Sequence, residues 1–316
     1  MRARIPVLSI MLLLTLPSHA DDILIGTGSK AGVYFQVGRA MCHLLNRNVE
    51  GVTCTPLETA GSVSNLANVT GGSLEIGIVQ SDIQFHAVNR SGPYQFVDTP
   101  HDNLRALFSL YVEPFNLVAR RDAGISSLND LPGRRINVGN TGSGHRETME
   151  VVMQAKGWTA DDFQLMTELP ASQQTMALCH DRVQALVYTA GHPNPSIAKA
   201  IALCDAMLVE VSGPEIDRLV SDNPFYTTTA VPVGVYTGVS QPVKTFGTLA
   251  TAIASSDTDD ELVYSIVKTL FENFDRFKRM HQAFRDLDPK KMVSDGLAAP
   301  LHSGAERYYR ERGWMN

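Results

Sequence analysis

Two glycine-rich turns carry the residue types that are best suited to bind a small anion. The first spans residues 26–34; it follows a short apolar run, 23–25, and precedes an amphipathic segment that begins near Val33. The second spans residues 139–146 and again follows an apolar run, 136–138. A strand, a tight turn and a helix start together aim backbone N–H groups and hydroxyls at an anion. We therefore expect the two turns to form opposite walls of one binding cleft.

Polar residues at these turns and at neighbouring strand ends define the candidate ligand-binding set. Ser62 is a suitable N-cap for a helix, and Gln80 ends an apolar strand predicted over 74–79. In a parallel sheet such positions lie at the carboxyl ends of the strands, where ligands gather. Arg146 is the side chain best suited to hold a carboxylate through two parallel hydrogen bonds. The expected ligand-binding residues are Gly28, Ser29, Tyr34, Ser62, Val63, Asn65, Gln80, Thr141, Ser143, Arg146 and Gly191.

The sequence lacks the common catalytic motifs. Its nine histidines form no His-Glu-x-x-His pair, and no Gly-x-Ser-x-Gly segment is present. The first turn reads Gly-x-Gly-x-x-x-Gly, which misses the dinucleotide-binding pattern by one residue, and the second lacks the lysine of a phosphate loop. Glu113, beside Pro114, could act as a general base but is better explained as a hinge or rim residue. We expect no catalytic residue, no cofactor and no metal; an enzyme with an anion-binding cleft is the less favoured alternative.

The composition is that of an ordinary globular protein. The chain has 316 residues, of which 44% are hydrophobic and 19% are charged, so it can bury a large core. Its formal net charge is −6, and no cluster of lysine and arginine in the sequence could hold a phosphate backbone. These features argue against nucleic acid as a partner.

The N-terminus has the pattern of a cleaved secretory signal. Arg2 and Arg4 form a basic region, residues 10–16 are apolar, and small residues precede a cleavage site between Ala20 and Asp21. An uncleaved membrane anchor is the alternative, but the apolar run is shorter than the roughly 20 residues that span a bilayer. We therefore expect residues 1–20 to be removed, and the mature chain to be exported and not inserted in the membrane.

Four cysteines fit an exported protein. Cys42 and Cys54 lie close in sequence, as do Cys179 and Cys204, and an even number in an exported chain suggests disulfides. Three pairings are possible; sequence order favours the two local ones, and buried free thiols are the alternative. The spacing is too loose for a zinc cluster.

The order of predicted elements indicates an α/β protein with two lobes. Strands and helices alternate from residue 23 to about 90, and a second unit of the same kind starts at 136, which predicts mostly parallel sheets flanked by helices. We place the first lobe at 21–120 plus 232–316 and the second at 121–231. The ligand cleft is expected between them. We also predict separate strands at 104–110 and 115–119, and one long helix at 260–277.

The ordered set of motifs resembles the TAXI family of TRAP transporter solute-binding proteins. No single motif is decisive, but the resemblance extends from Ile23 to about Gly313. The residues that carry it are Gly26–Ser29 with Gly32–Tyr34, Gly61–Val63 with Asn65, Gln80–Asp82, Gly139 with Gly142–Gly144, Gly191–Pro193, and Pro300–His302 with Gly304–Ala305.

The resemblance implies a monomeric, periplasmic, two-lobed binding protein of the type II fold. It also implies capture of a small organic acid, such as glutamate, glutamine, 2-oxoglutarate or a similar dicarboxylate, and delivery to the membrane subunits of a TRAP permease. Two local disulfides fit a subset of the family. The sequence departs from the family at Lys30, Phe35, Glu75 and Asn116, and Lys30 could add positive charge at the cleft mouth. An amino-acid receptor of an ATP-driven importer, or the sensing lobe of a receptor, has the same fold and remains the alternative.

Overall fold

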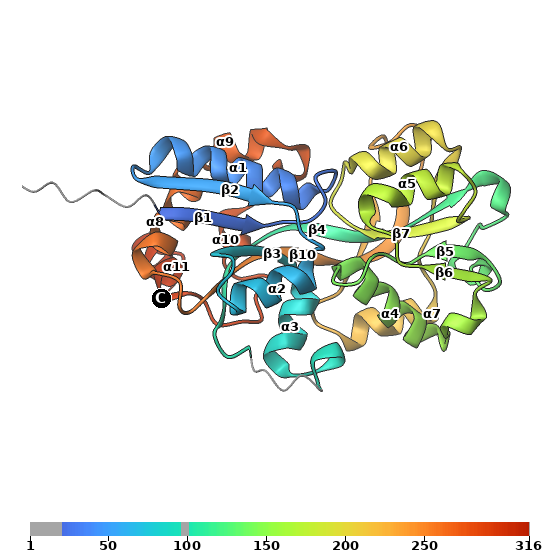
Figure 1. Ribbon diagram of the computed structural model, residues 1–316, viewed down its shortest axis with the longest axis horizontal. Helices are drawn as coiled ribbons and strands as arrows, with labels where there is room; N and C mark the ends of the chain where they lie inside the picture. The colour runs from blue at the N-terminus through green and yellow to red at the C-terminus, as the bar shows by residue number, and fades with distance from the viewer. Residues whose placement is uncertain (1–20, 96–100, 316) are drawn as a thin grey trace, which may run out of the picture.

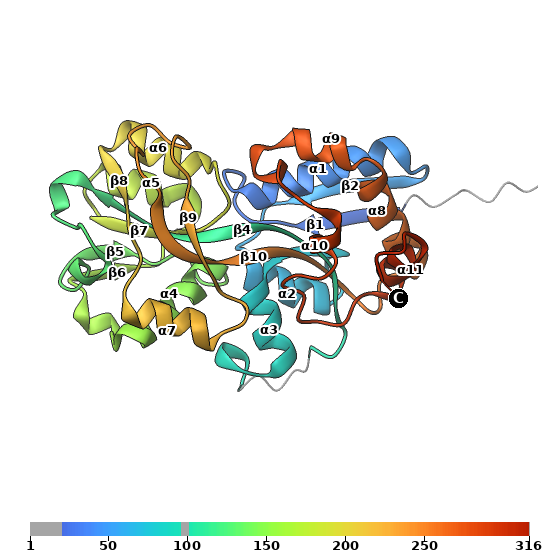
Figure 2. The same cartoon turned by 180° about the vertical axis from the view of Figure 1, so that it is seen from behind.

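The computed structural model describes residues 21–95 and 101–315, which form two lobes side by side (Figures 1 and 2). Two long strands, β4 (Leu104–Arg120) and β10 (Val243–Ser255), run from one lobe into the other. The strand order is β2-β1-β3-β10-β4-β7-β5-β6, with β8 on β4 and β9 on β10. The predicted signal, residues 1–20, lies outside the described residues.

The first lobe contains the N-terminal strands and helices together with the C-terminal helices. Its apolar core joins the buried face of α1 to α8, where Val37, Met41 and Leu44 lie in one cluster with Ile266 and Leu270. The elements are β1 (Asp21–Gly26), α1 (Val33–Asn48), β2 (Val52–Leu57), α2 (Ser62–Thr70), β3 (Ile76–Gln80), α3 (Ser81–Asn89), α8 (Asp260–Glu272), α9 (Phe274–Met280), α10 (Pro289–Met292) and α11 (Ser303–Glu311).

The second lobe repeats the alternation of strands and helices around its own apolar cores, as the sequence predicts. Helices α4 and α7 cover one face of its strands, and α5 and α6 cover the other (Figure 1). The elements are β5 (Arg135–Asn137), α4 (Gly144–Lys156), β6 (Leu165–Thr167), α5 (Ala171–Cys179), β7 (Ala185–Thr189), α6 (Pro195–Leu203), β8 (Ala206–Val209), α7 (Pro214–Asp222) and β9 (Thr227–Val231).

The two crossing strands modify the expected parallel sheets. The pairs β1–β2, β1–β3, β5–β6 and β5–β7 are parallel, whereas the antiparallel pairs all involve β4 or β10. β4 pairs with β10 over its first part and with β7 and β8 from Phe115 onward. The crossings therefore lie within strands, so the chain passes between the lobes before residue 120 and after residue 231.

Two sequence predictions about element length are wrong. The separate strands expected at 104–110 and 115–119 are one strand, because Glu113 and Pro114 keep their register with Thr248 and Gly247 of β10. The single helix expected at 260–277 is two helices that meet at Asn273, whose side-chain amide donates to the carbonyl of Thr269.

Both local disulfides are present, which confirms the favoured pairing. Cys42–Cys54 joins α1 to β2, and Cys179–Cys204 joins the C-terminal ends of α5 and α6. Within 21–95 and 101–315, none of the helices is both long and apolar enough to cross a bilayer.

Candidate ligand-binding cleft

A cavity of about 420 Å³ lies between the lobes. From the first lobe it is lined by the turn after β1, the start of α2 and the end of β3. From the second lobe it is lined by the turn before α4 and by the starts of α5 and α6. The floor is formed by Glu113 of β4 and by Tyr188 and Thr189, the last residues of β7. The two glycine-rich turns therefore lie on opposite walls, as the sequence predicts.

Helices α2 and α4 begin next to one another across the cleft. Gly61, not Ser62, is the N-cap of α2, and Ser62 is its first helical residue. At the start of α4, the Ser143 hydroxyl accepts a hydrogen bond from the backbone N–H of Arg146. The first N–H groups of an α-helix have no partner within the helix. Among the described residues, those of Ser62, Val63, Gly144 and His145 have no acceptor, so they are free to bind an anion.

The lobes touch along this line, so the structure is a closed form. Asn140 donates to the carbonyl of Ala60 at 3.2 Å, and the Ser64 N–H donates to the carbonyl of Gly142 at 3.2 Å. The approach is closest at Gly144, where a Cβ would stand 2.8 Å from Ser62 Oγ and nearer still to the amide of Gln80. A side chain at this position would hold the lobes apart.

The floor carries a buried carboxyl group without a cationic partner. Glu113 is 2% exposed, and its Oε2 accepts a hydrogen bond of 2.6 Å from the Tyr34 hydroxyl. Burial raises the pKa of Glu113 well above its usual range, the Tyr34 hydrogen bond lowers it, and Asp82 adds a smaller upward contribution. Burial and the charge of Glu113 likewise raise the pKa of Tyr34, so its hydroxyl stays protonated and acts as a donor.

The second lobe contributes cleft residues that the sequence analysis missed. Thr189 ends β7 and is buried, and its hydroxyl has no partner within the described chain. Asn194 caps α6 by accepting from the N–H groups of Ser196 and Ile197. The rule that ligands gather at the carboxyl ends of strands would have identified Thr189.

The structure brings part of the expected set together. Gly28, Ser29, Tyr34, Ser62, Gln80 and Ser143 all line the cleft. Asn65 does not line the cleft. It is fully buried, and its amide donates to the carbonyls of Thr27 and Ile78, so it holds the turn after β1 against β3. Val63 is not among the residues that line the cleft: its side chain packs against the core of the first lobe, and its backbone N–H lies in the first turn of α2, next to Ser62.

Thr141 and Arg146 lie outside the cleft, in the wall of a separate cavity of about 890 Å³. The Arg146 guanidinium is paired with Glu150 and, at 3.0 Å, with Glu168, and the Thr141 hydroxyl donates to Glu168. Arg146 is therefore not placed as the carboxylate ligand that the sequence predicts, because two neighbouring carboxylates already hold it.

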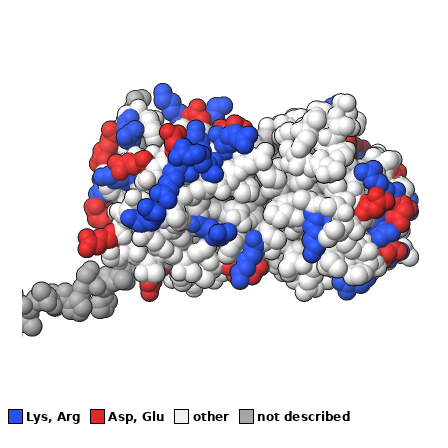
Figure 3. Space-filling model, turned by 90° about the horizontal axis from the view of Figure 1, so that it is seen from above, with Lys and Arg blue, Asp and Glu red and all other residues white. Residues whose placement is uncertain are grey.

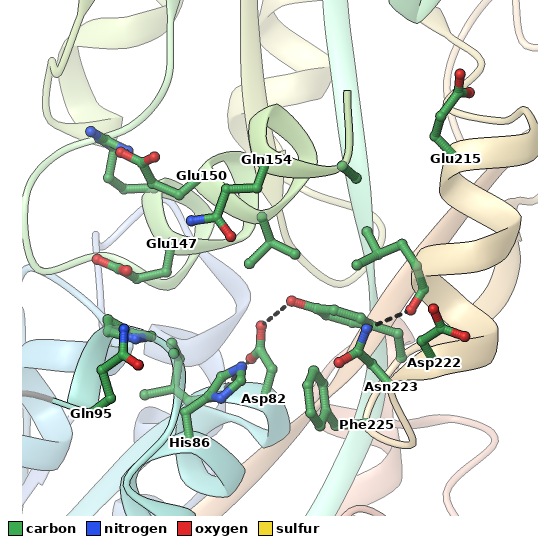
Figure 4. A pocket seen from close by; sticks show the side chains of 18 of the residues that line it. Asp82, His86, Gln95, Glu147, Glu150, Gln154, Glu215, Asp222, Asn223 and Phe225 are labelled. Atoms are coloured by element: carbon green, nitrogen blue, oxygen red, sulfur yellow. Dashed lines mark hydrogen bonds and ion pairs between the residues drawn. The ribbon is translucent and has the colours of Figure 1, made fainter. Parts of the chain in front are cut away.

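This second cavity lies between α3 of the first lobe and α4 and α7 of the second (Figure 4). Carboxyl groups surround it, including Asp82, Glu147 and Asp222. Asp82 accepts a hydrogen bond of 3.0 Å from Tyr226, which is a further link between the lobes. The smaller cavity is the better candidate for a ligand site, because the starts of α2 and α4 face one another there with backbone N–H groups that have no acceptor among the described residues.

Two further expected residues have other roles. Gly191 does not line the cleft; a Cβ at this position would lie 2.4 Å from the ring of Tyr111, so glycine is needed for packing. Lys30 stands at the exposed mouth, where its ammonium lies 4.0 Å from Glu58. This pairing offsets the positive charge expected there.

The face that carries α1, α9, α5 and α6 is mostly uncharged between the lobes (Figure 3). Basic side chains gather over the first lobe, where Arg276 of α9 donates to His43 of α1. The sequence did not reveal this gathering because the two helices are far apart in the chain. No group of three or more His, Cys, Asp or Glu residues within 21–95 and 101–315 could hold a metal ion.

Solved structures with the same fold include several binding proteins. MatC from Rhodopseudomonas palustris, with bound malate, is 13% identical with a TM-score of 0.59 over 95% of this chain and 98% of MatC. A chain from work on glutathione import via GshT and the cystine ABC importer TcyBC of Streptococcus mutans is 10% identical with a TM-score of 0.53, over 87% of this chain and 98% of that one.

A histidine kinase sensor domain with similarity to periplasmic binding proteins is 14% identical, with a TM-score of 0.51 over 86% of this chain and 99% of the domain. At these identities the likeness shows the fold, which is the two-lobed α/β fold of periplasmic solute-binding proteins. A family model matches residues 25–313. With a cleft built from both lobes and a family match over nearly its whole described length, the chain belongs to the NMT1-like family.

Proposed function

We propose that the protein is an extracytoplasmic receptor that captures a small organic acid by closing its two lobes, and that it catalyses no reaction. The observation that carries this proposal is the pair of facing helix starts, α2 and α4, with four backbone N–H groups that lack acceptors in the described chain. Helix N-termini attract anions through these groups and through the helix dipole. Each wall supplies one start, so the site is complete only when the lobes are closed.

The proposed binding residues follow from this geometry. The N–H groups of Ser62 and Val63 from one wall, and of Gly144 and His145 from the other, bind the ligand's carboxylate. The unpartnered hydroxyl of Thr189 adds a donor from the floor. Ser29, Tyr34, Gln80 and Ser143 complete the polar lining, and Gly28 leaves room at the turn.

Within the NMT1-like family, we assign the chain to the TAXI proteins that serve TRAP-type secondary transporters. The motif set from Gly26 to Ala305 supports this assignment, as does the local pairing of both disulfides. The signal-like sequence at 1–20 supports export to the periplasm, where the closed receptor would meet the membrane subunits of the permease.

Ligand screening tests receptor function. The mature chain is mixed with matched amino, 2-oxo and hydroxy acids, and unfolding is followed by thermal shift; native mass spectrometry identifies any co-purified ligand. A ligand at 100 times its Kd stabilises the folded state by about 2.7 kcal/mol, which raises the melting temperature by several degrees. If no organic acid raised it while a sugar or a cation did, the proposal would be wrong.

The class of transporter needs a separate experiment. Uptake of labelled ligand is measured in cells that carry the receptor and its membrane partner, after either the ion gradient has been dissipated or ATP has been depleted. A TRAP system should lose uptake when the ion gradient is dissipated. Uptake that survived dissipation and stopped on ATP depletion would favour the ATP-driven importer instead.

A further inference from the structure

The cleft has an unusual balance of charge for a site that binds an organic acid. No lysine or arginine lines it among the described residues. Its acidic residues are Glu58, which is exposed at the rim, and Glu113, which is buried on the floor. His145 adds no positive charge at neutral pH, because burial lowers its pKa to about 4. The helix starts are therefore the positive end of the cleft, and Glu113, when it is ionised, is its negative end.

The surroundings of Glu113 leave one oxygen available. Its Oε2 accepts from Tyr34, whereas its Oε1 has no partner within the described chain and no cation faces either oxygen. A buried carboxylate without a cation is costly, and a cationic group that reached it would remove much of that cost. A ligand that carries an ammonium group would supply such a cation.

The negative and positive ends are close together. The Tyr34 hydroxyl bridges them: it donates to Glu113 at 2.6 Å and lies 3.5 Å from Ser62 Oγ, at the start of α2. A ligand that contacts both ends must carry its cation and its carboxylate near one another. An α-amino acid has both groups on one carbon. A dicarboxylate without an amine would instead place negative charge beside Glu113.

We propose that Glu113 binds the ammonium group of the ligand, and that the cleft takes a zwitterionic α-amino acid in preference to a 2-oxo or 2-hydroxy acid of the same carbon skeleton. This inference rests on the proposed receptor function and adds the class of ligand. Tyr34 is a positioning residue that orients the carboxylate of Glu113 toward the cleft.

Matched ligand sets test the proposal by calorimetry. Each set contains one amino acid and its 2-oxo and 2-hydroxy analogues: glutamate, aspartate and alanine with their counterparts. Leaving a buried charge without its partner typically costs enough to lower affinity by 30-fold or more. The amino acid of the best-binding set should therefore bind at least about 30-fold more tightly than its analogues.

Variants locate that preference. Glu113→Gln keeps the shape and the acceptor for Tyr34, and should abolish the preference for the amine. The matched control, Glu58→Gln at the exposed rim, should retain it. If Glu113→Gln did not fold, Glu113→Asp would serve, since the shortened carboxylate should weaken binding of the amino acid more than of its analogues.

The pH dependence of binding separates two roles of Glu113. The ionisable groups that face it are Tyr34 from α1, Tyr111 from its own strand and Asp82 from α3. An ammonium ligand requires the ionised carboxylate, so affinity in the wild type should rise as the pH rises through the raised pKa of Glu113, and Glu113→Gln should remove this rise. A protonated Glu113 that donated to a ligand carboxylate would give the opposite slope.

The outcomes distinguish this inference from the proposed function. If a 2-oxo or 2-hydroxy acid bound as tightly as the amino acid, or if Glu113→Gln kept the preference, the inference would be overturned while the receptor function stood. If no member of any set bound, receptor function for organic acids would fail as well.

Discussion

Asp82 shows how one buried side chain can link the lobes and respond to pH. It is 2% exposed, and it accepts hydrogen bonds from the backbone N–H of Ile83 at 2.9 Å and from the Tyr226 hydroxyl at 3.0 Å. Burial raises its pKa from 3.8 to about 6, although both hydrogen bonds act in the other direction. Between about pH 4 and pH 6, the Asp82 carboxyl group therefore stays protonated in the folded chain, whereas it is ionised in the unfolded chain.

This shift predicts that the Asp82 contribution to stability falls as pH rises from about 4 to about 6. The folded pKa exceeds the unfolded value, so the cost is absent below the lower pH and fully present above the upper one, at about 3 kcal/mol. The free energy of unfolding, measured in urea, should therefore decrease less in Asp82→Asn than in the wild type as the pH rises from about 4 to about 6.

The control for this measurement is Asp222→Asn, an exposed position in the same cavity. It should keep the wild-type slope. An Asp82→Asn profile parallel to the wild type would show that this carboxyl does not titrate differently on unfolding. Glu113 contributes with the same sign, so some slope should remain in the variant.

At the scale of residues, the sequence predicted positions better than roles. Ser62, Gln80 and Ser143 were found because strand ends and helix starts can be read from local patterns. Arg146 was misplaced because a guanidinium group can pair with any carboxylate. The local sequence does not show whether that carboxylate belongs to a ligand or to Glu168, which is 22 residues away. Glu113 was read as a hinge or rim residue because its burial depends on both lobes.

At the scale of elements, the long strand β4 was the main error. Glu113 and Pro114 interrupt the apolar pattern, which locally resembles a strand end. The structure continues the strand because β10 pairs alongside it across the interruption. A partner more than 100 residues away decides this, so periodicity could not reveal it. Helix α1 lies nearly where it was expected because its amphipathic pattern is local.

The two disulfides predict a stability change without a change of site. Closing loops with sequence separations of 12 and 25 stabilises the fold by about 3 kcal/mol each in the chain-entropy model. The double variants Cys42→Ala/Cys54→Ala and Cys179→Ala/Cys204→Ala should each unfold at lower urea concentration. Neither pair lines the cleft, so ligand affinity should stay within a factor of about two.

A mass measurement provides the control for this prediction. Reduction of the purified wild-type chain should add the mass of four hydrogens, and reduction of either double variant the mass of two. A variant that kept wild-type stability would show that its bond does not restrict the unfolded chain. A strong loss of affinity would mean that the α5–α6 or α1–β2 junction positions the cleft.

At the scale of the whole molecule, the lobes are joined by a small number of polar contacts near the cleft. The Gln80 amide donates to the Thr148 hydroxyl at 3.0 Å, and both residues are buried. In an open form these groups would bond to water. Closure exchanges those bonds for one between the lobes, so the contact contributes to the balance between open and closed populations.

Thr148→Val should therefore weaken ligand binding by shifting that balance toward the open form. Loss of one neutral hydrogen bond corresponds to roughly 2- to 10-fold in affinity. Calorimetry would measure the loss, and small-angle scattering of the unliganded protein would show a larger radius of gyration. Thr141→Val is the matched control, because its hydroxyl bonds to Glu168 within one lobe. Equal losses in both variants would contradict the closure argument.

The position of Glu113 in a strand shared by both lobes has a consequence for timing. β4 and β10 lie side by side where the chain passes between the lobes, so Glu113 is near the axis about which they would rotate. Atoms near an axis move little, so Glu113 is in place before the second lobe closes. The ligand would then first bind to the first lobe and the crossing strands alone. Substitutions in α4 should lengthen or shorten the residence time of a bound molecule while leaving its rate of capture nearly unchanged.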